Sequence, residues 1–217
     1  VRLNVSIVLK EDALWAKAGH EILKEQFALN DHLMAVADGV QPGRRKSKFS
    51  VLDLWEDSYF QAFRAPTDND KSFGNWLAKD WKNQGITPET ETQETDGTVS
   101  KKSVVEYRYA KGSIRVSSHY KIYVDGTVDL EQTYLPQGEL PELPRLGSAF
   151  VLGEEYENLS WYGRGPWENY PDRKTSCLIG RWNSKVSEQY THYPRPQDSG
   201  NHEDVTEVVL TNKQGKG

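Results

Sequence analysis

Apolar residues alternate with polar ones along residues 114–135, and this pattern constrains the fold more than any other feature of the sequence. The apolar side chains fall at even positions, namely Ile114, Val116, Tyr120, Ile122, Val128, Leu130 and Tyr134. A period of two residues is typical of a β-strand with one buried face. An Asp125-Gly126 pair in the middle favours a tight turn. We therefore predict a β-hairpin.

The turn of this hairpin can be closed by two residues or by three, and the choice decides where the apolar rows lie. A two-residue Asp125-Gly126 loop sets even positions opposite odd ones, so the two rows face opposite sides. A loop of residues 124–126 pairs position 122 with 128, and both rows then share one face. We predict this second register, with Gly126 in the left-handed conformation that closes a bulged turn.

Other segments are also predicted to be extended. Residues 2–9 alternate as a half-buried strand does, and strands are expected at 148–152 and 157–162. Residues 87–98, rich in Thr and Glu, favour an exposed extended segment. Residues 21–29 fit a strand or a short helix equally well. Many short strands with turn signals predict a mainly β, antiparallel sandwich.

Proline and glycine mark the breaks in this pattern. Three prolines within residues 135–147 each remove a backbone N–H, which indicates an extended connection or a sheet edge. Residues 38–48 combine Gly, Pro and four cations and are predicted to be an exposed loop or linker. One short helix is expected over 75–83, with Asn75 as its N-cap and Gly85 just beyond its end.

Composition excludes several classes of function. The 217 residues carry 27 Lys plus Arg against 32 Asp plus Glu, a net charge of −5, which argues against nucleic-acid binding. The apolar runs are shorter than the ~20 residues that cross a bilayer. No signal peptide is expected, and the chain looks like part of something longer. Cys177, the single cysteine, cannot form an internal disulfide, which leaves a cytoplasmic or periplasmic location open.

No catalytic motif stands out by its spacing. The five histidines show no metal-ligand spacing, and no glycine-rich phosphate loop is present. Glycoside hydrolysis needs two carboxylates set about 5 Å or more apart across the scissile bond, and nothing singles out such a pair among the 32 acids.

Two loops carry residues suited to binding. In residues 63–70, Asp68, Asn69 and Asp70 follow a proline, so they can hold a cation or sugar hydroxyls, or simply cap the next helix. Residues 161–173 interleave aromatic residues with Glu, Asn, Asp and Arg. Such a loop can stack against a sugar, or it can be a rigid structural loop held by Arg–carboxylate pairs. Composition does not decide between these alternatives.

At these loops the sequence resembles the C-terminal domain of bacterial β-galactosidases of glycoside hydrolase family 2. Four blocks match in order, at residues 63–70, 143–147, 161–173 and 193–201. The start of the chain is similar to the end of the preceding immunoglobulin-like domain through residues 18–21 and 26–27. Residues 28–63 are shorter than in the family.

The resemblance implies a fold and a division of the chain. It implies an antiparallel β-supersandwich of the galactose-mutarotase type, here incomplete. Residues 1–30 would end the immunoglobulin-like domain, residues 31–48 would form the basic linker, and residues 49–217 would form the supersandwich, truncated at its C-terminus.

The resemblance also implies an activity for the parent protein. That protein would be a retaining hydrolase of terminal β-D-galactosides such as lactose, and a homo-oligomer. Its catalytic glutamates would belong to a TIM barrel absent from this chain, so the fragment alone is expected to be inactive. The parent would use Mg or Na, and no cofactor or metal site is expected in the fragment. Expected partners are the remaining domains and the galactoside, with no nucleic acid and no membrane.

Site residues follow from the matched blocks. A wall of the substrate pocket would include Asp68, Asn69, Asp70 and Phe73. The structural motif loop would comprise Trp161, Gly163, Gly165, Pro166, Glu168, Asn169, Tyr170, Asp172 and Arg173. We predict that Arg173 pairs with an internal carboxylate, and that Arg173→Ala costs about 2–4 kcal/mol if the pair is buried.

Two alternatives to the non-catalytic domain remain. One is an independent carbohydrate-binding module, and the other is a structural or oligomerisation element.

Overall fold

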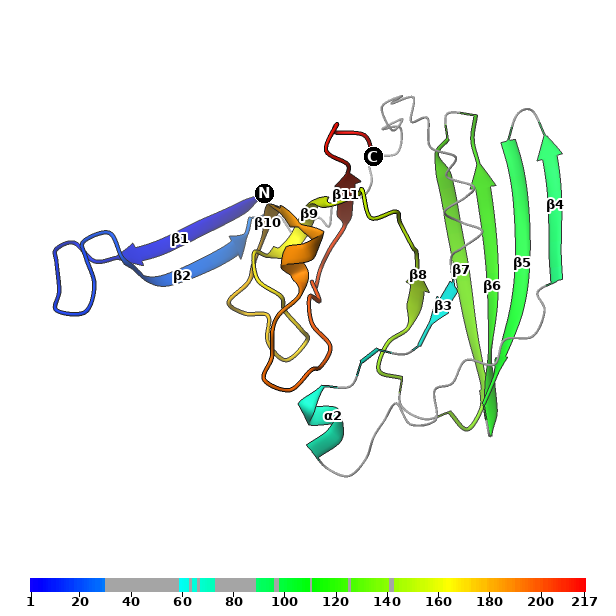
Figure 1. Cartoon of the computed structure of the whole chain (residues 1–217), viewed down its shortest axis with the longest axis horizontal. Coiled ribbons are helices and arrows are strands. Elements are labelled where there is room, and N and C mark those ends of the chain that lie inside the picture. Colours follow the sequence, from blue (N-terminus) through cyan, green and yellow to red (C-terminus); the bar gives the residue numbers. More distant parts are fainter. Residues whose placement is uncertain are drawn as a thin grey trace. The chain divides into compact units, whose positions relative to one another are not determined.

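Antiparallel β-strands dominate the structure, as predicted (Figure 1). It is a computed structural model that describes residues 1–29, 59–62, 64–65, 67–72, 89–95, 98–109, 111–124, 126–140 and 143–217. The chain divides into two compact units, Val1–Arg44 and Arg45–Gly217. The predicted helix at 75–83 and linker at 31–48 lie outside the described residues, so the predicted domain boundaries stay a prediction.

The first unit contains an antiparallel hairpin. Strands β1 (Arg2–Val8) and β2 (Glu21–Ala28) pair with Leu3 opposite Phe27 and Ile7 opposite Leu23. Residues 21–29, which fitted strand or helix, therefore form a strand. The strand predicted at 2–9 is also present. Its apolar side chains Leu3, Val5 and Ile7 are 43–52% exposed, so the expected half-burial is not observed among the described residues.

The second unit contains a four-stranded meander in the order β4-β5-β6-β7. Its strands are β4 (Glu89–Thr95), β5 (Thr98–Arg108), β6 (Gly112–Ile122) and β7 (Val128–Gly138). The extended conformation predicted for 87–98 is thus present over Glu89–Thr95, the part of the segment that β4 covers, and its predicted exposure stays a prediction. Pro136 lies in β7, an edge strand of this sheet, where its missing N–H costs no ladder bond.

The β6–β7 hairpin has the predicted three-residue register. Ile122 pairs with Val128, and the N–H of Tyr123 donates to the carbonyl of Thr127 at 2.9 Å. Gly126 has φ +85°, the left-handed conformation that the loop requires. The even-numbered side chains Ile114, Val116, Tyr120 and Ile122 are buried, so the parity of the sequence predicted both the register and the buried face.

A short two-stranded ladder covers this buried face. Strand β3 (Tyr59–Gln61) pairs with β8 (Gly147–Ala149). The Phe60 ring lies 4.6 Å from that of Tyr107 and 5.9 Å from that of Tyr134, between ring centroids. The core cluster consists of Phe60, Ala62, Ile114 and Val116, with Tyr107, Tyr109, Tyr134 and Leu140 packed against it. Strand β8 ends at Ala149, earlier than the strand predicted at 148–152.

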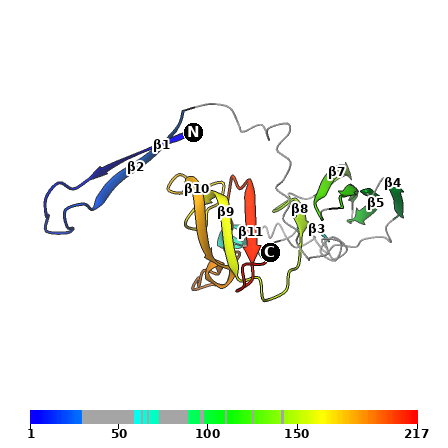
Figure 2. The same ribbon diagram turned by 90° about the horizontal axis from the view of Figure 1, so that it is seen from above.

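A separate three-stranded sheet has the order β10-β9-β11 (Figure 2). Strands β9 (Asn158–Gly165) and β10 (Leu178–Lys185) pair along their full length, and β11 (Glu207–Thr211) pairs with the other edge of β9. A 3₁₀ turn, η1 (Val186–Gln189), follows β10. Strand β9 runs beyond the segment predicted at 157–162. Two long connections leave this sheet, over residues 166–177 and 190–206, and they carry the candidate site.

Candidate functional site

The connection that follows β9 is fixed by a buried asparagine. Asn169 has no solvent exposure. Its backbone N–H donates to the carbonyl of Asn201 at 2.7 Å, and its carbonyl accepts from Asn201 Nδ2 at 2.7 Å. Its side chain donates to the carbonyl of Trp167 at 2.9 Å and accepts from the N–H of Glu203 at 2.8 Å. Three of these hydrogen bonds, to Asn201 and Glu203, tie this loop to the connection between β10 and β11, and the fourth lies within the loop.

We call the place where the loop at residues 166–177 contacts the connection at residues 190–206 the junction. Glu168 adds a charged set of contacts to this junction. Its carboxylate accepts from the Tyr193 hydroxyl, from Arg173 Nη2 at 2.7 Å and from the N–H of Gly200 at 2.9 Å. Burial opposes the ionised form. The hydrogen bonds from Tyr193, Gly200 and Arg173 outweigh burial, and the pKa of Glu168 lies below 4.5. The predicted pairing of Arg173 with an internal carboxylate is confirmed.

The buried member of this pair is the carboxylate and not the guanidinium. The Arg173 side chain is 55% exposed, whereas that of Glu168 is 11% exposed. The condition attached to the predicted loss of about 2–4 kcal/mol, a buried pair, is therefore not met. Solvent screens the exposed partner, and Arg173→Ala is expected to cost about 1 kcal/mol.

Arg164 closes the base of the loop. It donates through Nε to Asp204 Oδ2 at 2.6 Å and through Nη1 to the carbonyls of Lys174 and Cys177, at 3.2 and 2.9 Å. Asp204 has φ +54°, a left-handed conformation that non-glycine residues rarely adopt. One side chain thus joins both long connections to the end of β9.

The turn at residues 67–70 is shaped by its own side chains. The short helix α2 (Asp68–Ser72) begins after Thr67. Asp70 Oδ2 accepts from the N–H of Thr67 at 2.7 Å, and the Thr67 hydroxyl accepts from the N–H of Asp70 at 3.3 Å. Arg64 donates to both carboxylate oxygens of Asp70, at 2.5 and 3.3 Å. Burial opposes ionisation of Asp70, but the bonds from Arg64 and Thr67 hold its pKa below 3.8.

This turn is joined to the junction through Gln197. The N–H of Asp68 donates to Gln197 Oε1 at 2.9 Å, although 129 positions separate the two residues. The neighbouring Asp198 carboxylate lies 3.6 Å from Arg145 Nη2 and is 12% exposed. Burial raises the pKa of Asp198, and Arg145 and Arg64 offset this only in part. Residues from all four matched blocks therefore meet around Gln197 and Asp198.

The site residues predicted from the sequence differ in how far they are buried. Asp68 and Asp70 are half-buried at the turn and Asn69 is exposed there, while Phe73 lies outside the described residues. Trp161 is buried, and its indole N–H donates to the carbonyl of Arg164 at 3.0 Å. Trp167 and Asp172 are exposed.

Glycine is required at two positions of the motif because neighbours approach closely. A Cβ on Gly163 would lie 2.8 Å from Val205, and one on Gly165 would lie 2.6 Å from the Trp182 ring. The Gly165–Pro166 peptide bond is cis.

Burial, together with the negative charges of Asp198 and Glu168, raises the pKa of Tyr170 to about 12.

Sequence reasoning assigned no role to several residues that the structure places at the junction. Gln197, Asp198 and Asn201 belonged to the fourth block, but their partners lie too far away in sequence to be inferred from spacing. Thr67 had a local signal, because Thr-x-x-Asp is the pattern of a capping box.

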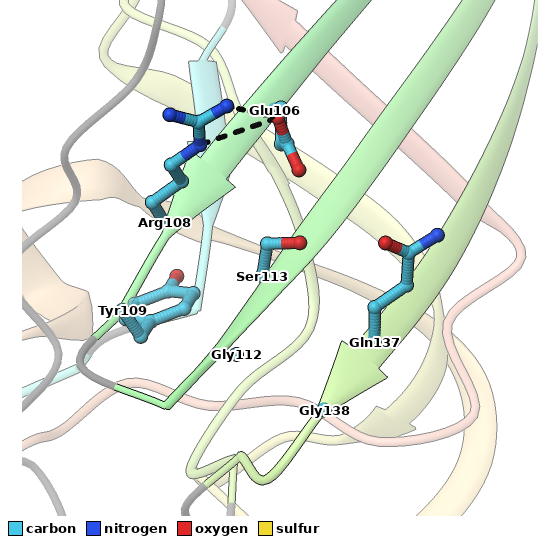
Figure 3. Close-up of a pocket in the computed structure, with 7 residues that line it drawn as sticks. All are labelled: Glu106, Arg108, Tyr109, Gly112, Ser113, Gln137 and Gly138. Carbon is cyan, nitrogen blue, oxygen red and sulfur yellow. Dashed lines mark hydrogen bonds and ion pairs between the residues drawn. The ribbon is translucent and has the colours of Figure 1, made fainter.

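Two hollows lie elsewhere in the second unit. One, of about 340 Å³, lies at the end of β5, β6 and β7 and is lined by Glu106, Arg108, Tyr109, Gly112, Ser113, Gln137 and Gly138 (Figure 3). Hydrogen bonds from Ser113 and Arg108 lower the pKa of Glu106. The other, of about 430 Å³, lies on the β9–β11 sheet and contains Glu188. Each hollow presents a single carboxylate, not a facing pair.

The described part of the chain contains neither a metal-binding cluster nor a membrane-spanning helix. No group of three or more His, Cys, Asp or Glu side chains is placed there to hold a metal ion. In the same residues, no helix has the length and apolar character needed to cross a membrane.

Comparison with known proteins identifies the family. The model of the beta galactosidase small chain matches residues 44–216. The chain belongs to this beta-galactosidase family. The model of beta-galactosidase domain 4 matches residues 1–30.

Curated relatives carry the same name. The beta-galactosidases of Priestia megaterium and Halalkalibacterium halodurans are each 30% identical to this chain and match 99% of it. That of Kluyveromyces lactis is 30% identical over 93% of the chain. The chain spans 23–25% of the length of these three relatives, so the family member described here corresponds to about a quarter of a beta-galactosidase.

Proposed function

We propose that this chain is a non-catalytic part of a retaining β-galactosidase, which hydrolyses terminal β-D-galactosides such as lactose. In this proposal the catalytic carboxylates, and any Mg or Na of the parent enzyme, belong to polypeptide outside residues 1–217. The family and the names of the relatives support the parent activity. The non-catalytic role is supported by the hydrogen bonds that acidic side chains make to neighbouring residues of the fold.

One observation carries this assignment: the carboxylates of Asp70 and Glu168 are already engaged by hydrogen bonds that hold the fold. Asp70 is paired with Arg64, and Glu168 is bonded to Arg173, Tyr193 and Gly200. Asp198 lies beside Arg145. A retaining glycosidase needs one free carboxylate as nucleophile and a second as acid/base. The junction offers charges that stabilise structure instead.

The turn at residues 68–70 is proposed to form one wall of the parent's galactoside pocket. Asp70 and Thr67 fix its shape, and the exposed Asn69 side chain is left to face a ligand. An amide that both donates and accepts suits sugar hydroxyl groups.

The first experiment measures hydrolysis of nitrophenyl β-galactoside by the purified 217-residue chain and by the full-length parent. We expect turnover by the parent and none by the chain. Hydrolysis by the chain that survives repurification would overturn the non-catalytic assignment.

The wall is tested separately in the full-length parent. Asn69→Ala is expected to raise KM several-fold, while the matched exposed substitution Asn183→Ala on β10 leaves KM unchanged. An unchanged KM for Asn69→Ala would remove the turn from the pocket and leave the family assignment intact.

A second candidate function, an independent carbohydrate-binding module, is favoured by Trp167. Its side chain is 69% exposed, while its carbonyl is held by Asn169. An exposed indole can stack on a sugar. Lactose titration of the chain followed by tryptophan fluorescence tests this function: a response abolished by Trp167→Ala supports it, and no response counts against it.

Association into a homo-oligomer is proposed for the parent alone. Light scattering of parent and chain at equal mass concentration tests it: a parent mass above that of one polypeptide is expected, and a self-associating chain would support an oligomerisation role instead.

A further inference from the structure

The Asp68–Asp70 turn is held by two sets of contacts with different consequences. Contacts within residues 64–70 determine its shape, through Arg64, Thr67 and Asp70. The contact from Gln197 joins it to the rest of the second unit. Removing a contact of the first kind would disturb the shape of the turn, whereas removing the second would weaken its attachment and leave its internal contacts in place.

The segment that carries Gln197 is itself anchored on its C-terminal side. The N–H of Gly200 donates to Glu168 at 2.9 Å, and Asn201 Nδ2 donates to the carbonyl of Asn169 at 2.7 Å. Gly200 has φ +79°, and a Cβ there would lie 2.6 Å from the carbonyl oxygen of Gln189. Asn169 is fully buried, so these anchors attach the segment to an ordered part of the unit.

Asp198 fixes the same segment beside Gln197. Its carboxylate pairs with Arg145 at 3.6 Å and is mostly buried. Gln197 is therefore followed directly by an ion-paired residue and, three positions later, by a hydrogen-bonded glycine, and both restrict the backbone on its C-terminal side.

From this arrangement we infer that Gln197 is a positioning residue for the Asp68–Asp70 turn: its side-chain carbonyl fixes the turn to the buried Glu168–Asn169 loop. Gln197 need not contact the galactoside. The hydrogen bond between the Asp68 N–H and Gln197 belongs to the fold of this chain and does not depend on the proposed function. Its effect on substrate affinity rests on the proposed function, because it requires the turn to be a wall of the pocket.

The test begins with the 217-residue chain and does not depend on activity. Gln197→Met keeps the length of the side chain and removes the carbonyl acceptor. Hydrogen–deuterium exchange is measured in peptides covering residues 64–72 and, as an internal reference, residues 158–165 of β9. Loss of one net hydrogen bond predicts about threefold to tenfold faster exchange in the first peptide relative to the second.

Two further variants complete this part of the test. Gln197→Glu retains an acceptor and is expected to restore most of the protection. Gln214→Leu, an exposed substitution near the C-terminus, is expected to change neither peptide. Because the readout is a ratio between two peptides of one unit, a general loss of stability cancels. Equal exchange ratios in Gln197→Met and the unsubstituted chain would overturn the inference.

Kinetics of the full-length parent then separate the inference from the proposed function. With a positioned wall, Gln197→Met raises KM for nitrophenyl β-galactoside several-fold and changes kcat less, and Gln197→Glu restores KM. Faster exchange with an unchanged KM would keep the positioning role and reject the pocket wall. If the unsubstituted parent does not hydrolyse galactosides, the proposed function fails while the exchange result stands.

Discussion

At the scale of single residues, Asn169 shows how a polar side chain can be fully buried when all of its hydrogen-bonding groups are paired. Both polar side-chain atoms of Asn169 and both of its backbone groups are hydrogen bonded. Burial of polar groups is unfavourable unless they are paired, so this saturation explains why an asparagine is tolerated with no exposure.

Asn169→Ala should therefore destabilise the chain strongly. It removes the side-chain donor to the Trp167 carbonyl and the acceptor of the Glu203 N–H, and it leaves the space of a fully buried side chain unfilled. We expect a loss of about 2–4 kcal/mol in the free energy of unfolding, measured by urea denaturation. Asn183→Ala on the exposed face of β10 is the control and should cost under about 0.5 kcal/mol. Similar losses for the two variants would contradict the saturated network.

Glu168 predicts a pH dependence. Its pKa is lowered in the folded chain, because the hydrogen bonds outweigh burial. A carboxylate with a depressed folded pKa contributes stability above its unfolded pKa, near 4.5, and loses it as the pH falls through the folded value. The stability difference between the unsubstituted chain and Glu168→Gln should thus be largest at pH 7 and shrink below pH 4.5. A difference that grows as the pH falls would show that the sign is wrong.

At the scale of elements, the alternation of apolar and polar residues predicted the strand register and the buried face of the hairpin. The register of the β6–β7 hairpin followed from the single requirement that both apolar rows share a face. The Arg173–Glu168 pair was also within reach, because five positions separate the partners. The β3–β8 ladder and the contact between Asp68 and Gln197 could not be predicted in this way, because both join segments that are far apart in the sequence. Asp68 and Gln197 are 129 positions apart, and nothing in the local pattern of either segment specifies the other as its partner.

The hairpin turn offers a matched test of backbone strain. A Cβ on Gly126 or on Gly147 would meet no atom within 4 Å, but Gly126 alone of the two has a positive φ. Gly126→Ala should therefore cost about 1 kcal/mol, whereas Gly147→Ala should be neutral or slightly stabilising. Denaturation midpoints of the two variants decide the matter, and equal values would exclude the left-handed conformation at Gly126.

At the scale of the whole molecule, the two units differ in how much they bury. Unit Arg45–Gly217 has a cluster built on Phe60, Ile114 and Val116, with a further layer of tyrosines. The described part of Val1–Arg44 is one hairpin whose apolar row stays exposed. An isolated two-stranded hairpin is at best marginally stable in water.

A peptide of residues 1–29 is accordingly expected to be largely unfolded. Its amide resonances should show narrow dispersion, and its circular dichroism should lack a strand signal. The full chain under the same conditions is the control and should show dispersed resonances for β9. A folded peptide would mean that the Leu3–Phe27 and Ile7–Leu23 pairs suffice without a second layer.

The hydrogen-bonded partners at the junction lie far apart in the sequence, and this has a consequence for biosynthesis. Glu168 and Asn169 receive partners that lie 32 and 34 positions later, at Gly200 and Glu203. The amide of Asp68 receives its partner 129 positions later. As the ribosome extends the polypeptide, the early loops emerge with their internal contacts, such as Arg64–Asp70 and Asn169–Trp167, but without these distant partners. They can be fixed in place only after residues 197–204 have left the exit tunnel, so nascent chains stalled before that point should be more sensitive to protease in the 64–72 and 166–177 loops.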